Sequence, residues 1–261
     1  MADSLLGAGN FDRAALEYER VIFRASNSSD VNNALFGRIN SFKKMQQFDK
    51  AAQELLRIRL FTLNQEQMLE YFYEKILCNY LSGSFIEARG AIDEMYLNIP
   101  DSTLCHATLI IQIFVYNELQ QWDLARQTAL YYSATLSSPE NENMNALIES
   151  LYANKNLPKL KSQKVSNVLA FVPGLAHIYA GEWVEGSVSF FLNSAVLAFG
   201  AYQILNGYYL TGYLLGAGIL SATYFGGFNR SAYLLQLYNQ QAVSLFNSDV
   251  REKLLVFLNV F

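Results

Sequence analysis

One short segment gathers the residues that could do chemistry. It runs from Pro173 to Gly186 and contains His177 together with Glu182 and Glu185. A histidine can act as a general acid or base near neutral pH, because its ordinary pKa is about 6.5. Such catalysis needs a second group that orients or activates the imidazole, and the segment contains no Cys, Asp or Ser. We therefore expect a hydrogen-bonding or interfacial role for His177, with a membrane enzyme that uses it as the alternative.

Other reactive side chains are sparse. The chain has two cysteines, Cys78 and Cys105, whose spacing indicates neither a disulfide framework nor a zinc site. Both lie in apolar helical stretches, where small buried side chains are expected. The net charge of −4 gives no basic surface that would favour nucleic acid as a partner. We expect no catalytic set, no cofactor and no metal site, and interpret the chain as not an enzyme.

The most apolar part of the chain follows this segment. Residues 186–229 contain no Asp, Glu, Lys, Arg or His. Two apolar runs, Ser187–Leu205 and Tyr208–Phe225, are separated by the turn signal Asn206-Gly207. Each run has about the ~20 residues that a helix needs to cross a bilayer. The sequence predicts a helical hairpin that crosses a membrane twice, with the two preceding glutamates at the water boundary.

Small residues recur in the second run, beginning with a GxxxG pair. The expected stripe consists of Gly212, Gly216, Gly218, Ala222 and Gly226. Small residues on one face let another helix approach closely, so either the first run or a partner helix is expected there. Asn193 is expected to bond across the hairpin. No charge lies inside either run, which argues against a transporter or pump.

An internal repeat of 37 residues precedes the membrane part. Each copy has an aromatic residue and an alanine three positions later. The pairs are Phe11 and Ala14, Phe48 and Ala51, Phe85 and Ala88, and Trp122 and Ala125. We expect these pairs to begin the second helix of each unit, with the first unit truncated. Because one amphipathic helix pair cannot bury its apolar side alone, the units are predicted to stack into a solenoid.

These residues resemble the tetratricopeptide repeat family over about residues 3–137. The aromatic, the alanine and an apolar residue seven positions after the aromatic match the family pattern, and Pro100 falls where its second helix often ends. Two departures are the longer unit, 37 instead of ~34 residues, and isoleucines in place of the small residue of the first helix. The resemblance implies a concave face that binds a protein or peptide. Candidate contact residues on the first helices are Asn33, Asn40, Glu74, Asn79, Gln112 and Asn117.

A basic linker joins the two parts. Residues 155–164 contain four lysines, and Pro158 disfavours a continuous helix across the join. The lysines could hold anionic lipid headgroups, mark the cytoplasmic side or simply be solvated. The expected organisation is a repeat domain at 1–154, this linker, and a membrane domain at 165–261. The membrane domain would end in an amphipathic helix over Ser231–Asn247 and an apolar tail over Arg251–Phe261.

The segment before the hairpin also resembles a known element, the PGxGxxYxGxxxxG motif of small bacterial two-helix membrane domains. The matching segment contains Pro173, Gly174, His177, Tyr179, Gly181, Trp183 and Gly186, with Ala176 where the motif has a second glycine. The resemblance implies an interfacial or re-entrant segment beside the hairpin. Tyr179 and Trp183 suit the headgroup region.

The combination of repeats with this element resembles envelope proteins of the Bacteroidetes type, which implies a bacterial inner membrane. In those proteins an Ala-Asp-Ser-Leu start follows a cleaved signal peptide, which favours a periplasmic repeat domain, whereas the lysines favour the cytoplasm. The leading hypothesis is a non-enzymatic adaptor that binds a protein or peptide and contacts membrane lipid. The alternative is an accessory subunit of a membrane complex for protein insertion, secretion or envelope biogenesis.

Overall fold

The computed structural model describes the backbone of residues 1–260 and the side chains of all of these except 215, 259 and 260. Every regular element in that range is a helix, which confirms the all-α class. The chain forms two compact units. Unit 1 comprises Met1–Asn156 together with Leu254–Phe261, and unit 2 comprises Leu157–Lys253.

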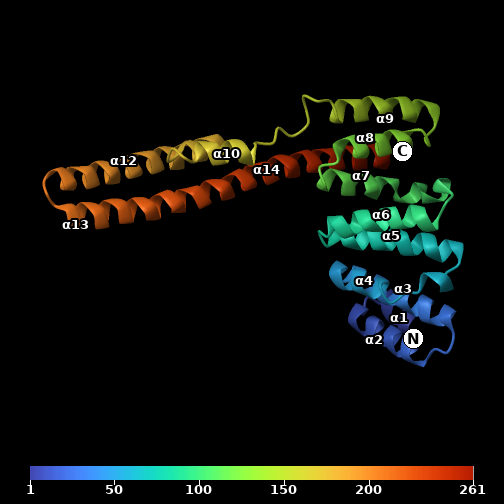
Figure 1. The fold of residues 1–261 in the computed structure, drawn as a ribbon. Coiled ribbons are helices and arrows are strands. Elements are labelled where there is room, and N and C mark those ends of the chain that lie inside the picture. Colours follow the sequence, from blue (N-terminus) through green and yellow to red (C-terminus); the bar gives the residue numbers. More distant parts are fainter. Residues whose placement is uncertain (261) are drawn as a thin grey trace. The chain divides into compact units, whose positions relative to one another are not determined.

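Unit 1 is built from helices that follow one another through short connections (Figure 1). They are α1 (Ala2–Gly7), α2 (Phe11–Arg24), α3 (Ser28–Lys44), α4 (Phe48–Leu55), α5 (Gln65–Leu81), α6 (Phe85–Asn98), α7 (Leu109–Glu118), α8 (Trp122–Ser133) and α9 (Ser138–Leu151), with short helices η1 (Leu60–Thr62) and η2 (Ser102–Thr108) before α5 and α7. Each helix from α1 to α8 packs against the next one in the chain.

The repeated aromatics mark helix starts. The helices α2, α4, α6 and α8 begin at Phe11, Phe48, Phe85 and Trp122. The alanines that follow three positions later are all fully buried, with 0% of their surface exposed at Ala14, Ala51, Ala88 and Ala125. An alanine at such a position lets two helices approach closely, and a larger side chain would not fit. The first helix, α1, has only 6 residues, as expected for a truncated first unit.

The same turn precedes each of these four helices. Gly9, Gln46, Gly83 and Gln120 lie two residues before the aromatics and have positive φ angles of 78°, 58°, 79° and 58°. At the second turn the Gln46 N–H donates to the Lys43 carbonyl and the Gln47 N–H to the Phe42 carbonyl, both at 2.9 Å. This is the Schellman motif, which satisfies the last carbonyls of the preceding helix. Glycine is the residue usually found at such a position, whereas a glutamine carries no turn signal.

The two glutamines make a stability prediction possible. A left-handed backbone costs a non-glycine residue about 1–2 kcal/mol, and glycine avoids that cost while losing some chain entropy. We expect Gln46→Gly and Gln120→Gly each to stabilise unit 1 by ~0.5–1 kcal/mol. The measurement is denaturant unfolding followed by Trp122 fluorescence in a Trp183→Phe background. Glu87→Gly, inside α6, is the matched control and should destabilise; a loss of stability with Gln46→Gly would contradict the turn geometry.

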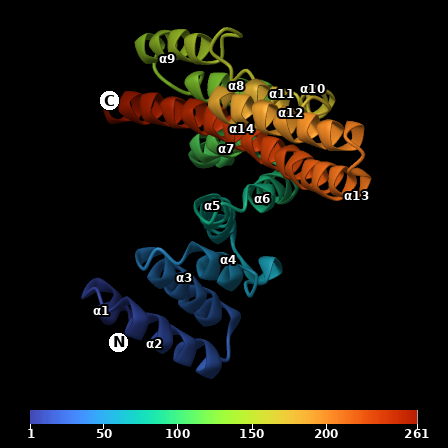
Figure 2. The same ribbon diagram turned by 90° about the vertical axis from the view of Figure 1, so that its left-hand side faces the viewer.

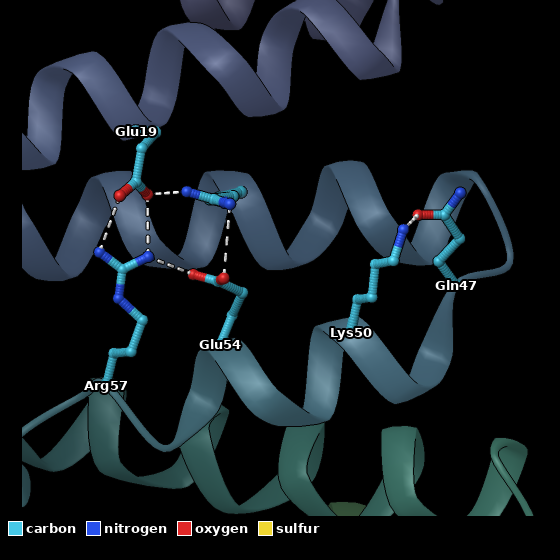
Figure 3. Close-up of polar contacts among 6 residues, drawn as sticks. Glu19, Gln47, Lys50, Glu54 and Arg57 are labelled. Atoms are coloured by element: carbon cyan, nitrogen blue, oxygen red, sulfur yellow. Dashed lines mark hydrogen bonds and ion pairs between the residues drawn. The ribbon is translucent and has the colours of Figure 1, made fainter.

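A network of charges joins the first three long helices (Figure 3). Glu19 on α2 pairs with Arg38 on α3, and with Arg57 after α4 at 2.8 Å. Glu54 on α4 pairs with the same two arginines, at 3.5 Å and 2.7 Å respectively. Alternating charges thus connect helices from two successive repeats. Because Glu19 and Arg57 are 41% and 38% exposed, we expect their ion pair to specify the neighbour of each helix more than to add stability.

Unit 2 contains one long helix pair. Its elements are α10 (Gln163–Leu169), α11 (Leu175–Ala180), α12 (Trp183–Leu205), α13 (Tyr209–Thr211), the π-helical segment η3 (Gly212–Ala217) and the part of α14 (Gly218–Val260) up to Lys253. The α13–η3–α14 run lies beside α12 and antiparallel to it in both views (Figures 1 and 2). The two are joined at Gly207, which has a φ of 81°. One helix in the described part of the chain, α12, is long and apolar enough to cross a membrane.

The C-terminal region differs from the sequence-based expectation. A separate amphipathic helix over Ser231–Asn247 was expected, but α14 continues unbroken from Gly218 to Val260. No proline and no glycine occurs after Gly227, so nothing in the sequence ends the helix. Residues from Leu254 onward belong to unit 1, and not to the membrane part as the 165–261 boundary implied. Phe261 lies outside the described residues.

Candidate functional site

The glycines of the Pro173–Gly186 segment hold a very close backbone contact. A side-chain carbon at Gly186 would lie 2.7 Å from the Gly174 carbonyl oxygen and 2.5 Å from Ile178 Cγ1, and one at Gly174 would collide with the Gly186 carbonyl. Gly174 also has a φ of 89°. Only glycine fits at either position, so this pair fixes the end of the Pro173 turn against the first turn of α12.

A third glycine of the segment leads the chain into α12. Gly181 has a φ of 111°. Its N–H donates to the Ile178 carbonyl at 3.0 Å, and the Glu182 N–H donates to the His177 carbonyl at 2.9 Å. This is the same pair of bonds that connects the helices of unit 1. The segment therefore forms a tight α11–α12 hairpin that carries His177 on its short arm.

His177 is buried between three helices of unit 2. Only 4% of its surface is exposed, and its Nδ1 has no protein hydrogen-bond partner among the described residues. A side-chain carbon at Gly227 of α14 would lie 3.6 Å from His177 Cε1 and 3.5 Å from Ser189 Oγ of α12. The surrounding cavity of about 10 Å³ is also lined by Tyr224 and Ser231. Glycine at 227 thus makes room for the imidazole.

The two charged groups that influence His177, Glu185 and Arg230, are paired with each other. Glu185 of α12 accepts two bonds from Arg230 of α14, at 2.7 Å and 3.1 Å. Burial lowers the pKa of His177 below its ordinary value, Glu185 opposes this and Arg230 adds to it. A neutral imidazole is therefore favoured in the fold. No carboxylate or hydroxyl among the described residues hydrogen-bonds to the buried Nδ1 of His177.

Acidification should weaken the packing of α11 against α12 and α14 around His177. Because the folded pKa of His177 is lowered, its contribution to stability is present above the unfolded pKa of about 6.5 and is lost as the pH falls through and below that value. We expect the unfolding midpoint of unit 2, read by Trp183 fluorescence in a Trp122→Phe background, to drop between pH 7.5 and pH 5.5. The drop should be smaller in His177→Gln, and unchanged in the control His106→Gln. Equal drops in the parent and His177→Gln would contradict the buried neutral imidazole.

The aromatic residues of the segment have separate surroundings. The Tyr179 hydroxyl accepts a bond from the Ser162 N–H at 2.9 Å, and the Lys161 ammonium lies 5.8 Å from the Tyr179 ring centre. Trp183 at the start of α12 is 68% exposed. Tyr179 thus packs on the linker, while Trp183 points away from the protein.

The basic linker is partly bound to unit 2. Lys161 donates its N–H to Asn239 of α14 at 2.8 Å and accepts a bond from the Asn239 side-chain amide at 2.9 Å. Its ammonium lies 3.5 Å from the Tyr238 ring centre, a cation–π distance. Lys159 and Lys164 are exposed. Lys155 is exposed as well, so three of the four linker lysines remain available to other partners, whereas Lys161 is held by the protein.

The contact between α12 and its partner run is made of small and polar residues. Buried residues of α12 are Gly186, Asn193 and Gly200. A side-chain carbon at Gly216 would lie 2.8 Å from the Gly200 Cα. Thr223 donates to the Asn193 side-chain oxygen at 2.8 Å, as expected of a bond across the hairpin. The two backbones thus meet directly at one level and through a side-chain hydrogen bond at another.

The expected single stripe of small residues is not formed. Gly212 and Gly216 face α12, with a carbon at Gly212 3.0 Å from the Gly200 carbonyl. Gly218 and Gly226 have no atom within 4 Å of an added side-chain carbon, and Ala222 is exposed. The reason is helix geometry: two residues from 216 to 218 turn the helix about halfway round. Gly200 was missed, although Gly186, Asn193 and Gly200 recur every seven residues, which is the signal of a helix seam.

The polar residues expected on the concave face of unit 1, which we call the arm, fall into two groups. Asn33, Glu74 and Asn79 bond to neighbouring residues Gln67, Lys43 and Lys75, and Asn40 is half-buried. Gln112 and Asn117 are each 1% exposed, so the expectation that they form a binding surface is wrong. They bond to Thr108 at 2.7 Å and to Tyr152 at 2.8 Å. All residues from Ile111 to Asn117 of α7 are buried, because apolar residues dominate that helix and its two buried amides have internal hydrogen-bond partners.

Comparisons of the chain with protein-family models, with curated proteins and with solved structures gave no match. In the described part of the chain, His, Cys, Asp and Glu residues form no group of three or more that could hold a metal ion.

Proposed function

We propose that this protein is a membrane-anchored adaptor without enzymatic activity. In this proposal α12 and the α13–η3–α14 run form a two-helix transmembrane hairpin. Unit 1 is a tetratricopeptide-like solenoid that binds a protein or peptide near the membrane. The proposal keeps His177 as a packing residue of the anchor.

The observation that carries the anchor is that the helix pair has its polar and small residues inside and its large apolar residues outside. The buried residues of α12 are two glycines and an asparagine, whereas Phe191, Leu197 and Leu192 are 70%, 60% and 49% exposed. In water, burying each such side chain would gain about 1.5–3 kcal/mol, so a soluble helix would turn these residues inward. In lipid that gain vanishes, and close backbone packing and hydrogen bonds hold helices together instead.

The length and the ends of the pair agree with a bilayer. At about 1.5 Å per residue, the 23 residues of α12 reach ~34 Å, enough for a hydrocarbon core of ~30 Å. Exposed aromatics lie at both ends: Trp183 at the base, and Tyr202, Tyr208 and Tyr209 around the tip. Tyrosine and tryptophan favour the two membrane–water interfaces. The ion pair Glu185–Arg230 lies at the base, on the same side as the linker lysines.

The arm's regularity supports the solenoid and its binding role. Helices begin at the repeated aromatics every 37 residues, and the buried alanines and positive-φ turns recur in the same register. Stacked helix pairs of this kind present extended surfaces to peptides and proteins. The buried α7 leaves α3 and α5, with Asn33, Asn40 and Asn79, as the first-helix surface on which we place the partner.

Thiol labelling in vesicles tests the anchor. Leu197 on α12 is 60% exposed and Leu214 is 58% exposed to the surroundings of the protein. Cysteines at these positions should resist a membrane-impermeant maleimide in intact vesicles. They should react once the vesicles are dissolved and the protein is unfolded with detergent and denaturant. The native cysteines are both buried and give little background. Cysteine at Asn206, in the tip, is the accessible control. Rapid labelling at 197 and 214 in intact vesicles would show a soluble helix pair and end the proposal.

We place the anchor in a bacterial inner membrane with the arm in the periplasm, the side that the likeness to envelope proteins implies. The exposed lysines of the linker favour the opposite side by the positive-inside tendency. Protease added to intact spheroplasts decides between them. Digestion of unit 1 supports the periplasm, and its protection until lysis would place it in the cytoplasm.

One observation favours the second candidate, an accessory subunit of an insertion, secretion or envelope-biogenesis complex. Gly218, Ala222 and Gly226 recur every four residues on α14, and the two glycines have open space beside them. A partner transmembrane helix could pack on these residues. Ala222→Leu should then release a co-purifying membrane protein while the hairpin stays folded. Retention of every partner by this variant would leave the soluble-partner adaptor as the better reading.

A further inference from the structure

Two short helices before the hairpin expose a row of large apolar side chains. On α10 and the turn after it, Val168 and Phe171 are 67% and 77% exposed. The row also includes Val165, Val172, Leu175 and Ile178. Val165 and Val168 lie three residues apart on one side of α10, and Leu175 and Ile178 do the same on α11. Phe171 and Val172 lie in the turn between the two helices. The other side of the same helices is packed, with Ser166, Ala170, Ala176 and Ala180 buried.

This row lies within a stretch of uniform charge. Residues 155–181 contain four lysines and no Asp or Glu. Lys161 is held by Asn239 and Tyr238, but Lys159 and Lys164 are exposed immediately before the apolar row. Along the chain the row continues into the exposed Trp183, Val184 and Val188 of α12. An apolar face with a basic edge, continuous with a lipid-facing helix, is typical of a segment that lies on an anionic membrane surface.

The geometry rules out a span for this segment. The helix α10 has 7 residues and α11 has 6, so at about 1.5 Å per residue neither approaches the ~30 Å of a hydrocarbon core. The turn at Pro173-Gly174 separates the two helices. Its closely packed glycines tie α11 to the base of α12. The apolar row can therefore reach only the boundary between headgroups and acyl chains next to that base.

We propose that α10 and α11 form an interfacial foot that binds anionic phospholipid. Val168 and Phe171 insert among the upper acyl chains, and the ammonium groups of Lys159 and Lys164 pair with the negative headgroups. This proposal rests on the transmembrane hairpin proposed above and names the lipid class that the anchor selects. It also gives the basic linker a function on the membrane surface.

Depth-resolved fluorescence quenching of the full-length protein in vesicles tests the foot. An environment-sensitive dye is attached to a cysteine at Phe171, and separately at Val168. The vesicles contain phosphatidylcholine alone or mixed with phosphatidylglycerol. With phosphatidylglycerol present, nitroxides near the headgroups should quench both positions strongly, and aqueous iodide should quench them weakly. The matched control is Asn167→Cys on the same helix, whose exposed side chain accepts a bond from Gln163 at 2.7 Å on the polar side; iodide should reach it.

Charge reversal tests the lipid class. Each basic residue near an anionic surface favours binding by about fivefold. Lys159→Glu with Lys164→Glu should therefore raise the iodide accessibility of position 171 by ~10-fold or more in phosphatidylglycerol vesicles, with little change in phosphatidylcholine. An equal response in both lipids would overturn the anionic preference.

The remaining outcomes separate this proposal from the anchor itself. A dye at Leu197, in the middle of α12, should be quenched only by nitroxides deep in the bilayer. Iodide access at 171 together with deep quenching at 197 would overturn the foot and leave the anchor standing. Iodide access at both positions would overturn the anchor. A dye at 171 that neither iodide nor lipid nitroxides quench would show that protein covers the apolar row, which also overturns the proposal.

Discussion

Gly216→Leu is expected to push α12 and α14 apart. A side-chain carbon at position 216 would lie 2.8 Å from the Gly200 Cα, which is backbone and cannot rotate away. Four carbons at this level would widen the contact towards the ~8–10 Å between helices that meet through their side chains. The Thr223–Asn193 hydrogen bond, at 2.8 Å, would then stretch or break. We expect the pair to lose ~3 kcal/mol or more, at the upper end of overpacking effects.

Pulsed EPR distances measure this separation directly. Spin labels at Leu197 on α12 and Ile219 on α14, both exposed, report the distance between the helices. The distribution should shift to longer distances and broaden in Gly216→Leu, and Gly200→Leu should do the same from the other helix. Leu214→Phe is the matched control, because Leu214 is 58% exposed and a larger ring there points away from α12. Distributions that match the parent in both glycine variants would mean that Gly200 and Gly216 are not in contact.

The sequence predicts the arm's helix starts because these depend on local, repeated signals. An aromatic, an alanine three positions later and an apolar residue four further on fall on one side of a helix, and four copies in register exclude chance. The turns before these helices are visible in the sequence at only two of the four positions. Gly9 and Gly83 announce a left-handed residue, but Gln46 and Gln120 adopt the same conformation because the repeat register requires it. Here the tertiary arrangement overrides a residue's own preference.

For the helix pair of unit 2, the sequence predicts the helices themselves but not which of their residues are in contact. The apolar runs and the turn at Asn206-Gly207 are visible in composition, and Asn193 was correctly expected to bond across the pair. Which small residues touch is a matter of rotation about each helix axis. Gly218 and Gly226 share four-residue spacing with the GxxxG pair yet lie on another face. To predict which residues share a helix face, one must therefore add up the rotation about the helix axis along the whole series. Equal spacing within each pair is not enough.

Contacts between residues that are distant in the chain could not be predicted from the sequence. Gln112 and Asn117 look like solvated helix residues, but α7 is buried on all sides, so both serve as internal hydrogen-bonding groups. Nothing in the arm's own repeat announces that Leu254–Phe261 belongs to unit 1. Likewise, the contact between Gly174 and Gly186 joins residues twelve apart in the chain, and their glycine identity hints at it without naming the partner.

Ala88→Trp is expected to open the arm. Ala88 is 0% exposed in α6, and α6 packs on α5 and α7. An indole at this position has no space, so the helices must separate, at a cost of ~3 kcal/mol or more. Cys78 on α5 reports the opening, because it is fully buried and burial raises the pKa of its thiol to about 12. Since every 1.4 kcal/mol changes an opening equilibrium about tenfold, thiol reactivity should rise by ~100-fold or more.

The control that makes this result specific is Glu87→Trp, one residue earlier on the same helix. Glu87 is exposed, so the same indole there should leave Cys78 unreactive. The full-length protein is used, because unit 1 includes Leu254–Phe261 and a fragment ending before α10 would lack them. A general effect of tryptophan on α6 would expose Cys78 in both variants, and a register shifted by one residue would reverse their order. Only a large rise in Ala88→Trp with none in Glu87→Trp agrees with the alanine at the helix contact, and with the 37-residue register on which the proposed binding surface of unit 1 depends.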